Sequence, residues 1–536
     1  MKFNFFTMLA VLLCGTACTP SSHKDSIDKN GLIYCSEGTP ETFNPQLVTS
    51  GTTIDIIAHQ LYNRLIGLAP VSGRFNPELA ERWDVSADGT RYTFFLRDDV
   101  EFHSTDYFTP TRKFNADDVI FSFNRILDNY NEYHYVNGGN YPFFQSVRFA
   151  ALVSNIKKID DYTVVFELYR PDNTFLSNLS TDFAVLLSKE YADHLLEIEQ
   201  PELLDSYPIG TGPFKFKEYK PNVLVRFYDH EKYWKNNVFL SQLVFDITVQ
   251  TSNRMAKLLT KECDVVAYPV HSQLSLLELN EEITVQREAN LNVGFWAFNT
   301  SKAPFSNPLV RKALAYGIDK DAILQAVYYG QAQYANSILP PSSWAFKNTL
   351  SDYYYDPDKA RNLLKKAGLE DGFTMDIWAM PVQRVYNPNA TKMAELIQAD
   401  LNKIGITANI VNYEWSTFRR KLAENQHDSV LIGWSADNPD PDNFFSPLLS
   451  CAAAITGSNR SGWCHEEFDN LLVKARTTTD LDERTALYYQ AQEILADELP
   501  LYSIAHSLRF QAQQSDIEGL TISPYGGLSF EQVRKK

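Results

Sequence analysis

Short apolar runs alternate with longer amphipathic segments along this chain, most regularly after Ala289. The apolar run from Val430 to Trp434 is too short for a helix and predicts a buried strand. The segment DPDKARNLLKKAG has helical spacing, a start at Asp356 and a stop at Gly368. Such alternation is typical of α/β units. In this half we expect strands at 373–380, 406–415 and 430–434, and helices at 307–318, 356–368, 389–405 and 481–496.

The N-terminal half has more strands and turns. Asn115 caps a predicted helix whose first turn is acidic. The segment ELAERW, from Glu78, is expected to end a helix, and the tyrosine-rich residues 130–144 are expected to form a long surface loop. Further predicted elements are a strand at 31–38, a helix at 54–65, two strands hinged at the Asp88-Gly89 turn, a strand at 162–170, and a bend at 208–219 that leads into a strand.

Length and charge limit the possible architecture and partners. A chain of 536 residues exceeds what one hydrophobic core normally holds, so we expect at least two domains. The formal net charge of -17 argues against nucleic acid as a partner, because that binding depends on Lys and Arg neutralising phosphates. The same charge would concentrate cationic ligands around the protein.

The N-terminus has the pattern of an export signal. Residues 1–17 contain one Lys, an apolar stretch from Phe3 to Leu13, and small residues before Cys18. Cleavage after Ala17 would leave Cys18 first, as in a bacterial lipoprotein, although Gly15 stands where such signals usually have Leu. Residues 18–30 are polar and predict a tether, and no later stretch predicts a membrane span.

The cysteine count bears on the same question. Removal of the signal takes Cys14 and leaves an odd set in an oxidising compartment. Pairing the last four would leave Cys18 over, which acylation would explain. The alternative is an ordinary periplasmic protein with Cys18 free or removed. The remaining five are Cys18, Cys35, Cys263, Cys451 and Cys464.

A polar loop follows the predicted strand at Val430. Its first acid, Asp437, lies just beyond the carboxyl end of that strand, where open α/β sheets bind ligands. The loop then reaches Cys451 and Cys464, which are close enough for a short disulfide loop. The acids of DNPDPD resemble a calcium loop, but the mid-loop Gly and terminal Glu are missing, so we expect no metal there.

A second loop carries the opposite charge. Arg384 and Tyr386 lie between a predicted strand and the next capped helix. For an isolated sequence, a surface Arg on a turn and a solvated loop acid at Asp437 are the more common outcomes. There is no nucleophile elbow, HExxH motif or Walker loop, so an enzyme has little support and no cofactor is expected.

Several long segments resemble one known family, the periplasmic peptide-binding proteins of ABC transporters. The resemblance covers essentially the whole mature chain and includes both dipeptide-binding and Sap-type members, with the Sap type favoured by segments such as SILPPSSWAF and PLLSCAAA. It rests mainly on YCSEGTPETFNPQ, LAERWDVSADGTRYTFFLR, FNADDVIFSFNRI, PIGTGPF, YNPNATKMAELIQADL, GWSADNPDPDNFF and LPLYSIAHSLRF.

The resemblance implies an α/β, two-lobed periplasmic-binding-protein fold (type II, cluster C) with an extra domain on the first lobe. Lobe I would comprise residues 31–62, 213–290 and 508–536, the appended domain II residues 63–212, and lobe III residues 291–507. The ligand would lie between the closed lobes of a monomer. Disulfides are implied between Cys35 and Cys263 and between Cys451 and Cys464.

The same resemblance assigns roles to the two charged loops. Asp437 would pair with the α-amine of a peptide and Arg384 with its α-carboxylate, with Tyr386 beside it. Strand-like backbone near Gly51 and Thr52, and near Trp434 and Ser435, would bind the peptide main chain.

The expected function is peptide capture and delivery to an inner-membrane ABC permease, with antimicrobial peptides as a possible cargo because the Sap type is linked to their uptake. Keeping Arg384 favours short peptides. The alternatives are a haem receptor, known among relatives, and a secreted hydrolase.

Overall fold

The computed structural model describes residues 30–536 except 70–73, 236–237, 270, 351–352 and 457. The predicted signal peptide, the lipid attachment at Cys18 and nearly all of the tether lie outside these residues. Within them, no helix has both the length and the apolar character needed to cross a membrane.

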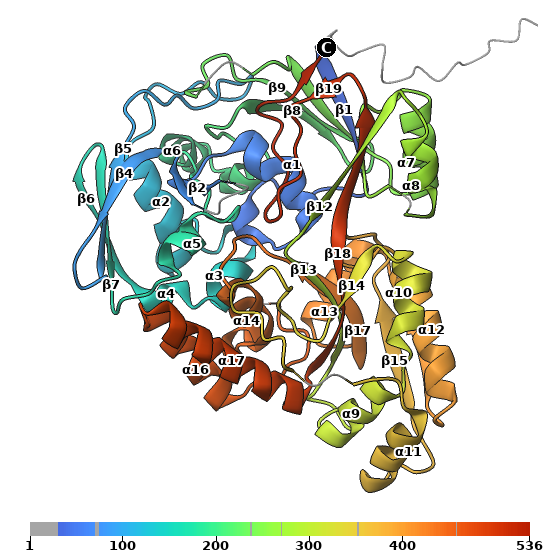
Figure 1. Ribbon diagram of the computed structural model, residues 1–536. Helices are drawn as coiled ribbons and strands as arrows, with labels where there is room; N and C mark the ends of the chain where they lie inside the picture. Colours follow the sequence, from blue (N-terminus) through green and yellow to red (C-terminus); the bar gives the residue numbers. More distant parts are fainter. Residues whose placement is uncertain (1–29, 70–73, 236–237, 270, 351–352, 457) are drawn as a thin grey trace, which may run out of the picture.

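Two lobes are joined by one long strand, β18 (Leu501–Gln514). Its first half pairs with β13 (Asn292–Phe298) and β14 (Ala332–Tyr334), and its second half pairs with β12 (Ile283–Ala289) and β11 (Val265–Ala267). Figure 1 shows β18 passing from one lobe into the other. The change of partners falls between Ser507 and Leu508. We propose that lobes I and III, with the bounds given above, meet at this point.

Lobe I is built on the parallel pair β1 (Gly31–Ser36) and β10 (Gln242–Ile247). The strands β9 (Leu224–Asp229) and β8 (Phe214–Lys220) extend the sheet on the β10 side, and β11 pairs with β1 on the other. An appended four-stranded sheet has the order β4-β5-β7-β6 (Figure 1). Its strands are β4 (Ala80–Val85), β5 (Arg91–Leu96), β6 (Val153–Asp160) and β7 (Thr163–Leu168), and the helices of this half are α1 (Gly51–Leu61), α2 (Ala116–Leu127), α3 (Pro142–Ser146), α4 (Phe149–Leu152), α5 (Phe175–Leu179), α6 (Lys189–Glu197), α7 (Thr251–Leu259) and α8 (Leu274–Glu278).

Lobe III continues the same sheet in the order β16-β15-β17-β13-β18. The strands β15 (Thr374–Ala379) and β17 (Ser429–Ser435) are parallel neighbours, and β16 (Thr407–Val411) is parallel to β15. The helices of this lobe are α9 (Pro308–Tyr316), α10 (Lys320–Tyr328), α11 (Pro357–Lys366), α12 (Ala390–Asn402), α13 (Trp415–Ala423), α14 (Asp442–Leu449), α15 (Cys451–Thr456), α16 (Glu466–Thr477) and α17 (Leu481–Glu498).

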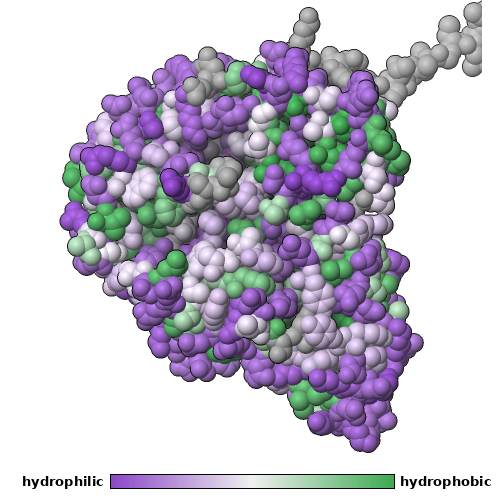
Figure 2. Space-filling view, in the orientation of Figure 1, coloured by the Kyte–Doolittle hydropathy of each residue, from purple (hydrophilic) through white to green (hydrophobic). Residues whose placement is uncertain are grey.

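Two large hydrophobic cores correspond to the two lobes. One core contains Phe94, Phe166 and Phe530, so lobe I and the appended sheet share their buried interior. The other contains Trp296 and Ile377 of lobe III. On the face shown in Figure 2, hydrophobic residues form separate small patches among hydrophilic ones.

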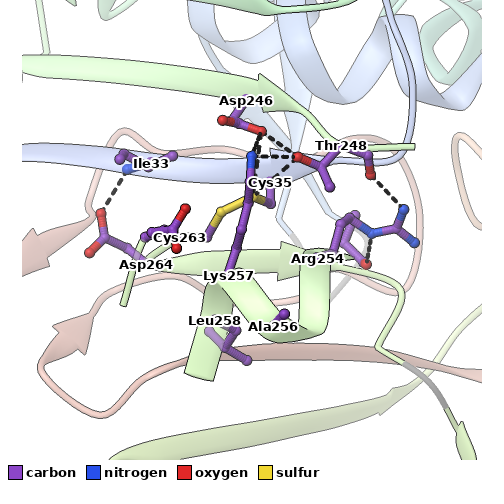
Figure 3. The surroundings of a disulfide bond; sticks show 12 residues. Ile33, Cys35, Asp246, Thr248, Arg254, Ala256, Lys257, Leu258, Cys263 and Asp264 are labelled. Atoms are coloured by element: carbon purple, nitrogen blue, oxygen red, sulfur yellow. Dashed lines mark hydrogen bonds and ion pairs between the residues drawn. A yellow bond between two sulfur atoms is a disulfide. The ribbon is translucent and has the colours of Figure 1, made fainter. Parts of the chain in front are cut away.

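A disulfide ties β1 to the start of β11. Cys35 and Cys263 are 228 residues apart and bonded, with their Cα atoms 5.9 Å apart. Beside them Lys257 Nζ donates to Asp246 Oδ1 at 2.7 Å, as Figure 3 shows. A chain cross-link that closes so long a loop restricts the unfolded chain strongly.

Most strands and helices lie where the hydrophobic pattern predicted them, including the helix capped by Asn115, which has a complete capping box. Two predictions were wrong. The segment ELAERW does not end a helix, since residues from Ala80 belong to β4. The tyrosine-rich segment is not a surface loop, because Tyr133, Tyr141 and Phe143 are almost fully buried. These aromatic side chains fill the space between α2 and α6, which outweighs the loop signal of the nearby glycines.

Candidate functional site

A cavity between the lobes collects most of the predicted site residues. Its volume is about 110 Å³. A single water needs roughly 10–15 Å³, so the cavity admits a small solute. Lobe III contributes Phe295, Arg384, Tyr386, Arg419, Trp434, Ser435, Asp437 and Arg460, and the other lobe contributes Thr49, Gly51, Asp55, Phe183, Tyr268, Arg509 and Gly526.

Contacts between the lobes close this cavity. Gly526 N donates to Ala436 O at 2.9 Å, and Asn438 Nδ2 donates to Ser177 O at 3.4 Å. The hydroxyl oxygens of Thr49 and Ser458 lie 3.4 Å apart. The structure is therefore the closed form of the two-lobed fold.

The parallel strands β15 and β17 place the two charged loops together. Arg384 follows the carboxyl end of β15, and Asp437 follows that of β17. Carboxyl ends of adjacent parallel strands lie at the same edge of a sheet, which is where such sheets bind ligands. The cavity contains both side chains.

Asp437 is an acid without a cationic partner among the described residues. Its carboxylate accepts one hydrogen bond, from Asn443 Nδ2 at 3.3 Å. Burial, reinforced by the Asp182 carboxylate, raises the pKa of Asp437 well above its ordinary value, and the Asn443 contact only partly opposes this. A ligand ammonium at this point would compensate the charge.

Arg384, by contrast, already has an acidic partner. Its Nη1 lies 2.9 Å from Glu37 Oε1, and its Nη2 donates to Thr52 Oγ1 at 2.6 Å. Burial opposes the charged form, but Glu37 together with Tyr268, Tyr386 and Asp55 outweighs burial, so the pKa of Arg384 lies above its ordinary value. The guanidinium carbon also lies 5.1 Å from the centre of the Trp415 ring.

Two glycines make room for Tyr386. A Cβ on Gly433 of β17 would lie 2.4 Å from the Tyr386 ring, and one on Gly294 of β13 would lie 2.2 Å from its carbonyl oxygen. Tyr328 donates a hydrogen bond from its hydroxyl to that carbonyl at 2.8 Å. Close packing against bare backbone therefore fixes the loop that carries Arg384.

Trp434 and Ser435 form the carboxyl end of β17. Within the described chain, β15 pairs with β17 only as far as Leu431, so the backbone from Ile432 onward has no strand partner on that side. Trp434 Nε1 donates to Asn443 Oδ1 at 3.1 Å, which holds the ring against the loop of Asp437. This free edge lines the cavity.

The prediction for Gly51 and Thr52 was only partly right. Both lie near the ligand space, but they are the first residues of α1 and not strand-like. Thr52 is buried and donates from Oγ1 to Glu37 Oε1 at 2.7 Å. A helix begins here because Ser50 and Gly51 allow the turn and the apolar residues from Ile54 need a buried face.

Sequence reasoning missed several charged residues of the cavity. Glu37 carried a usable signal, because it lies just beyond the carboxyl end of β1, as Asp437 does beyond β17. Arg509 pairs with Asp55 at 3.3 Å, and burial raises the pKa of Asp55 to about 6. Arg460 lies between two cysteines, where no pattern marks it.

The loop after Asp437 is more regular than predicted, since it forms the helices α14 and α15. Cys451 and Cys464 are bonded, with Cα atoms 4.5 Å apart. The disulfide encloses Ser458 and Arg460 of the cavity wall. Among the described residues no cluster of His, Cys, Asp or Glu has the arrangement of a metal site.

Two lobes closed over a cavity, with an unpaired acid and several arginines on its wall, define a solute-binding protein. The chain belongs to the bacterial extracellular solute-binding proteins of family 5, whose middle-region model matches residues 74–455.

The similar proteins cover nearly the whole chain. The dipeptide-binding protein of Escherichia coli K12 is 46% identical over 95% of both chains. The probable ABC transporter periplasmic-binding protein SapA of the same organism is 43% identical, with 99% of this chain and 97% of SapA covered. Heme-binding protein A of Haemophilus influenzae is 42% identical over 98% of both. Sequence identity therefore does not favour the Sap type over the dipeptide-binding type.

A solved structure agrees with the fold in detail. The dipeptide-binding protein of Pseudoalteromonas sp. SM9913, in complex with Met-Leu, superposes with a TM-score of 0.93 and 56% identity. The match covers 94% of this chain and 100% of that one. The two-lobed fold expected from the resemblance is confirmed.

Proposed function

We propose that this protein is the periplasmic receptor of a peptide ABC importer, which captures short peptides between its lobes and delivers them to an inner-membrane permease. The observation that carries the proposal is the unpaired Asp437 carboxylate in a closed cavity whose other charged groups are mainly arginines. The family, and relatives named for dipeptide binding and for peptide transport, support the same function.

Asp437 and Arg384 bind the two ends of the peptide in this proposal. An ammonium at Asp437 replaces a costly unpaired carboxylate by an ion pair. The peptide carboxylate accepts hydrogen bonds from the forked guanidinium of Arg384. It either shares this guanidinium with Glu37 or displaces Glu37 from it. The free edge from Ile432 to Ser435 binds main-chain groups, which are the same in every peptide.

The cavity favours short peptides over long cargo. Each extended residue adds about 3.3–3.6 Å, and the closed lobes leave about 110 Å³. A dipeptide is the occupant that suits this space. An extended antimicrobial peptide requires a more open arrangement of the lobes.

Haem fits this cavity less well. Of the residue types that bind haem iron, the described lining of the cavity holds no His, Cys or Met and has only the tyrosines Tyr268 and Tyr386. The cavity is also far smaller than a macrocycle requires. Transport without catalysis is in keeping with membership of a solute-binding family, and hydrolysis has no support from the site.

In the delivery step, the permease distinguishes the closed, peptide-bound receptor from the open one. A peptide that contacts both lobes stabilises the closed form only as far as it prefers that form. We place the receptor in the periplasm as a monomer, with attachment through Cys18 as the alternative to a free protein.

Calorimetry on ligand-free protein tests the proposal. The protein is unfolded, dialysed and refolded to remove any bound peptide, then titrated with Ala-Ala, acetyl-Ala-Ala and Ala-Ala amide. Tight binding of Ala-Ala alone supports the proposed function, and absence of binding to any short peptide overturns it. Haem titration followed at the Soret band, and mass spectrometry of the recovered peptide, test the haem and hydrolase alternatives.

A further inference from the structure

Arg460 is a cation in the cavity wall. In the proposed function the two charged ends of a dipeptide bind Asp437 and Arg384, so neither end binds Arg460. It lies in the disulfide-closed loop between Cys451 and Cys464 and lines the cavity. In the described part of the chain its guanidinium has no acidic partner, and only its backbone carbonyl is engaged, 2.7 Å from His427 Nε2. The half-buried guanidinium is therefore available to an anion that enters the cavity.

A second cation, Arg419 of α13, lies beside it. Burial, and then the charge of Arg419, lower the pKa of Arg460 to about 9. Arg460 is still protonated at neutral pH. The nearest acid to Arg419 is Glu41, 4.0 Å away and a quarter exposed, so it compensates Arg419 only weakly.

The charges that line the cavity do not balance. Of its four arginines, Arg509 pairs with Asp55 and Arg384 pairs with Glu37. A zwitterionic dipeptide brings an ammonium to Asp437 and one carboxylate to Arg384. That ligand leaves Arg419 and Arg460 together in a closed wall with no anion between them.

Arg460 and the weakly compensated Arg419 lie at the carboxylate end of the cavity. The guanidinium groups of Arg384 and Arg419 lie 5.1 and 5.6 Å from the same ring, that of Trp415. Asp437 lies in a different loop, the one that follows β17, where its carboxylate contacts Asn443.

We propose that Arg460 and Arg419 form a second anion subsite that selects short peptides with an acidic side chain on the C-terminal residue. This rests on the proposed peptide-binding function and adds a ligand class to it. The side-chain carboxylate of a C-terminal Asp or Glu lies between the two guanidinium groups, while the main-chain carboxylate stays at Arg384. Charge-assisted hydrogen bonds of this kind are stronger than those of a neutral amide.

Isosteric dipeptides test the subsite. Calorimetry on the refolded protein compares Ala-Glu with Ala-Gln, and Glu-Ala with Gln-Ala. We expect Ala-Glu to bind at least tenfold more tightly than Ala-Gln, with no comparable difference between Glu-Ala and Gln-Ala. Equal affinities for Ala-Glu and Ala-Gln overturn the proposal. An equal preference for Glu at both positions also overturns it, because it would indicate that the overall positive potential of the cavity, and not a local subsite, attracts the acid.

A matched pair of variants assigns the effect to Arg460. In R460Q the affinity for Ala-Glu should fall at least tenfold more than the affinity for Ala-Gln, so that the preference for Ala-Glu disappears. The control R420Q removes the same charge from the exposed face of α13, where Arg420 is 63% exposed, and should keep the preference. Equal weakening of both peptides by R460Q overturns the subsite and assigns Arg460 to the main-chain carboxylate or to folding.

The wild-type comparison stands even if R460Q fails to fold. If neither Ala-Glu nor Ala-Gln binds the wild type, the proposed function itself fails. If both bind equally, only the acidic preference fails.

Discussion

Glu37 and Arg384 are 347 residues apart in the chain and form an ion pair across the interlobe cavity, with Glu37 Oε1 2.9 Å from Arg384 Nη1. Both side chains are 4% exposed. Because Glu37 follows β1 of lobe I and Arg384 follows β15 of lobe III, the pair links the lobes only when they are closed. The group expected to take a ligand carboxylate is thus occupied by a carboxylate of the protein.

Breaking this pair should open the unliganded protein. In E37Q the buried guanidinium loses its partner, which costs about 3–5 kcal/mol in the closed form and shifts the closed-to-open ratio by about two to four powers of ten. Small-angle scattering of the ligand-free variant should give a larger radius of gyration than the wild type. The change should be absent in an R384Q background, and the control E41Q should have little effect because Glu41 and Arg419 are 4.0 Å apart.

Asp437 should decide whether an amine is bound. Removing one partner of a buried charge pair costs about 2–5 kcal/mol, so D437N should weaken Ala-Ala binding by about 30-fold to several thousand-fold. Affinity for acetyl-Ala-Ala, which has no charged amine, should change far less. Equal losses for both peptides in calorimetry would contradict the amine role.

The same substitution should stabilise the ligand-free protein at neutral pH. Burial raises the pKa of Asp437 above its ordinary value of 3.8, so its ionised form is less stable in the folded protein than in the unfolded chain. This carboxyl group therefore destabilises the fold increasingly as pH rises through its raised pKa. D437N should raise the unfolding temperature at pH 7 and leave it nearly unchanged near pH 4, as followed by circular dichroism.

Arg384 should discriminate free from blocked carboxyl groups. R384Q removes the forked donor, and loss of a charge-assisted contact of this kind is worth about 2–5 kcal/mol. Binding of Ala-Ala should fall accordingly. Ala-Ala amide should also bind less well, because the loss of the Glu37 pair disfavours closure, but its affinity should fall less, so the preference for Ala-Ala should disappear. A variant that still prefers Ala-Ala to its amide would show that another arginine takes the α-carboxylate.

Gly433 should not tolerate a side chain. In G433A the new Cβ would lie 2.3 Å from Val293 O and 2.4 Å from the Tyr386 ring, so β17 or the Arg384 loop must shift. Overpacking of this kind costs about 1–3 kcal/mol. Thermal unfolding should begin at a lower temperature than in the wild type. The control G51A has no heavy atom within 4 Å of its Cβ and should unfold as the wild type does.

The hydrophobic pattern and the turn residues were sufficient for most of the elements. The spacing of apolar residues predicted α2, α11, α12 and α17, and short apolar runs predicted β15 and β17. The position of Asp437 beyond the end of β17 followed from the same pattern. The buried segment around Tyr133 and Tyr141 was missed, because burial of aromatic side chains depends on helices far away in the chain.

The sequence by itself determined which residues form strands and helices, and that an acid and an arginine follow two strands of one lobe, because those properties depend on neighbours along the chain. Only the tertiary structure decided that β15 and β17 are parallel neighbours, that Glu37 of the other lobe holds Arg384, and that Arg460 has no acidic partner among the described residues. Those relationships join residues hundreds of positions apart. They depend on how two separately packed cores close over a shared cavity. Local sequence patterns do not predict such long-range contacts.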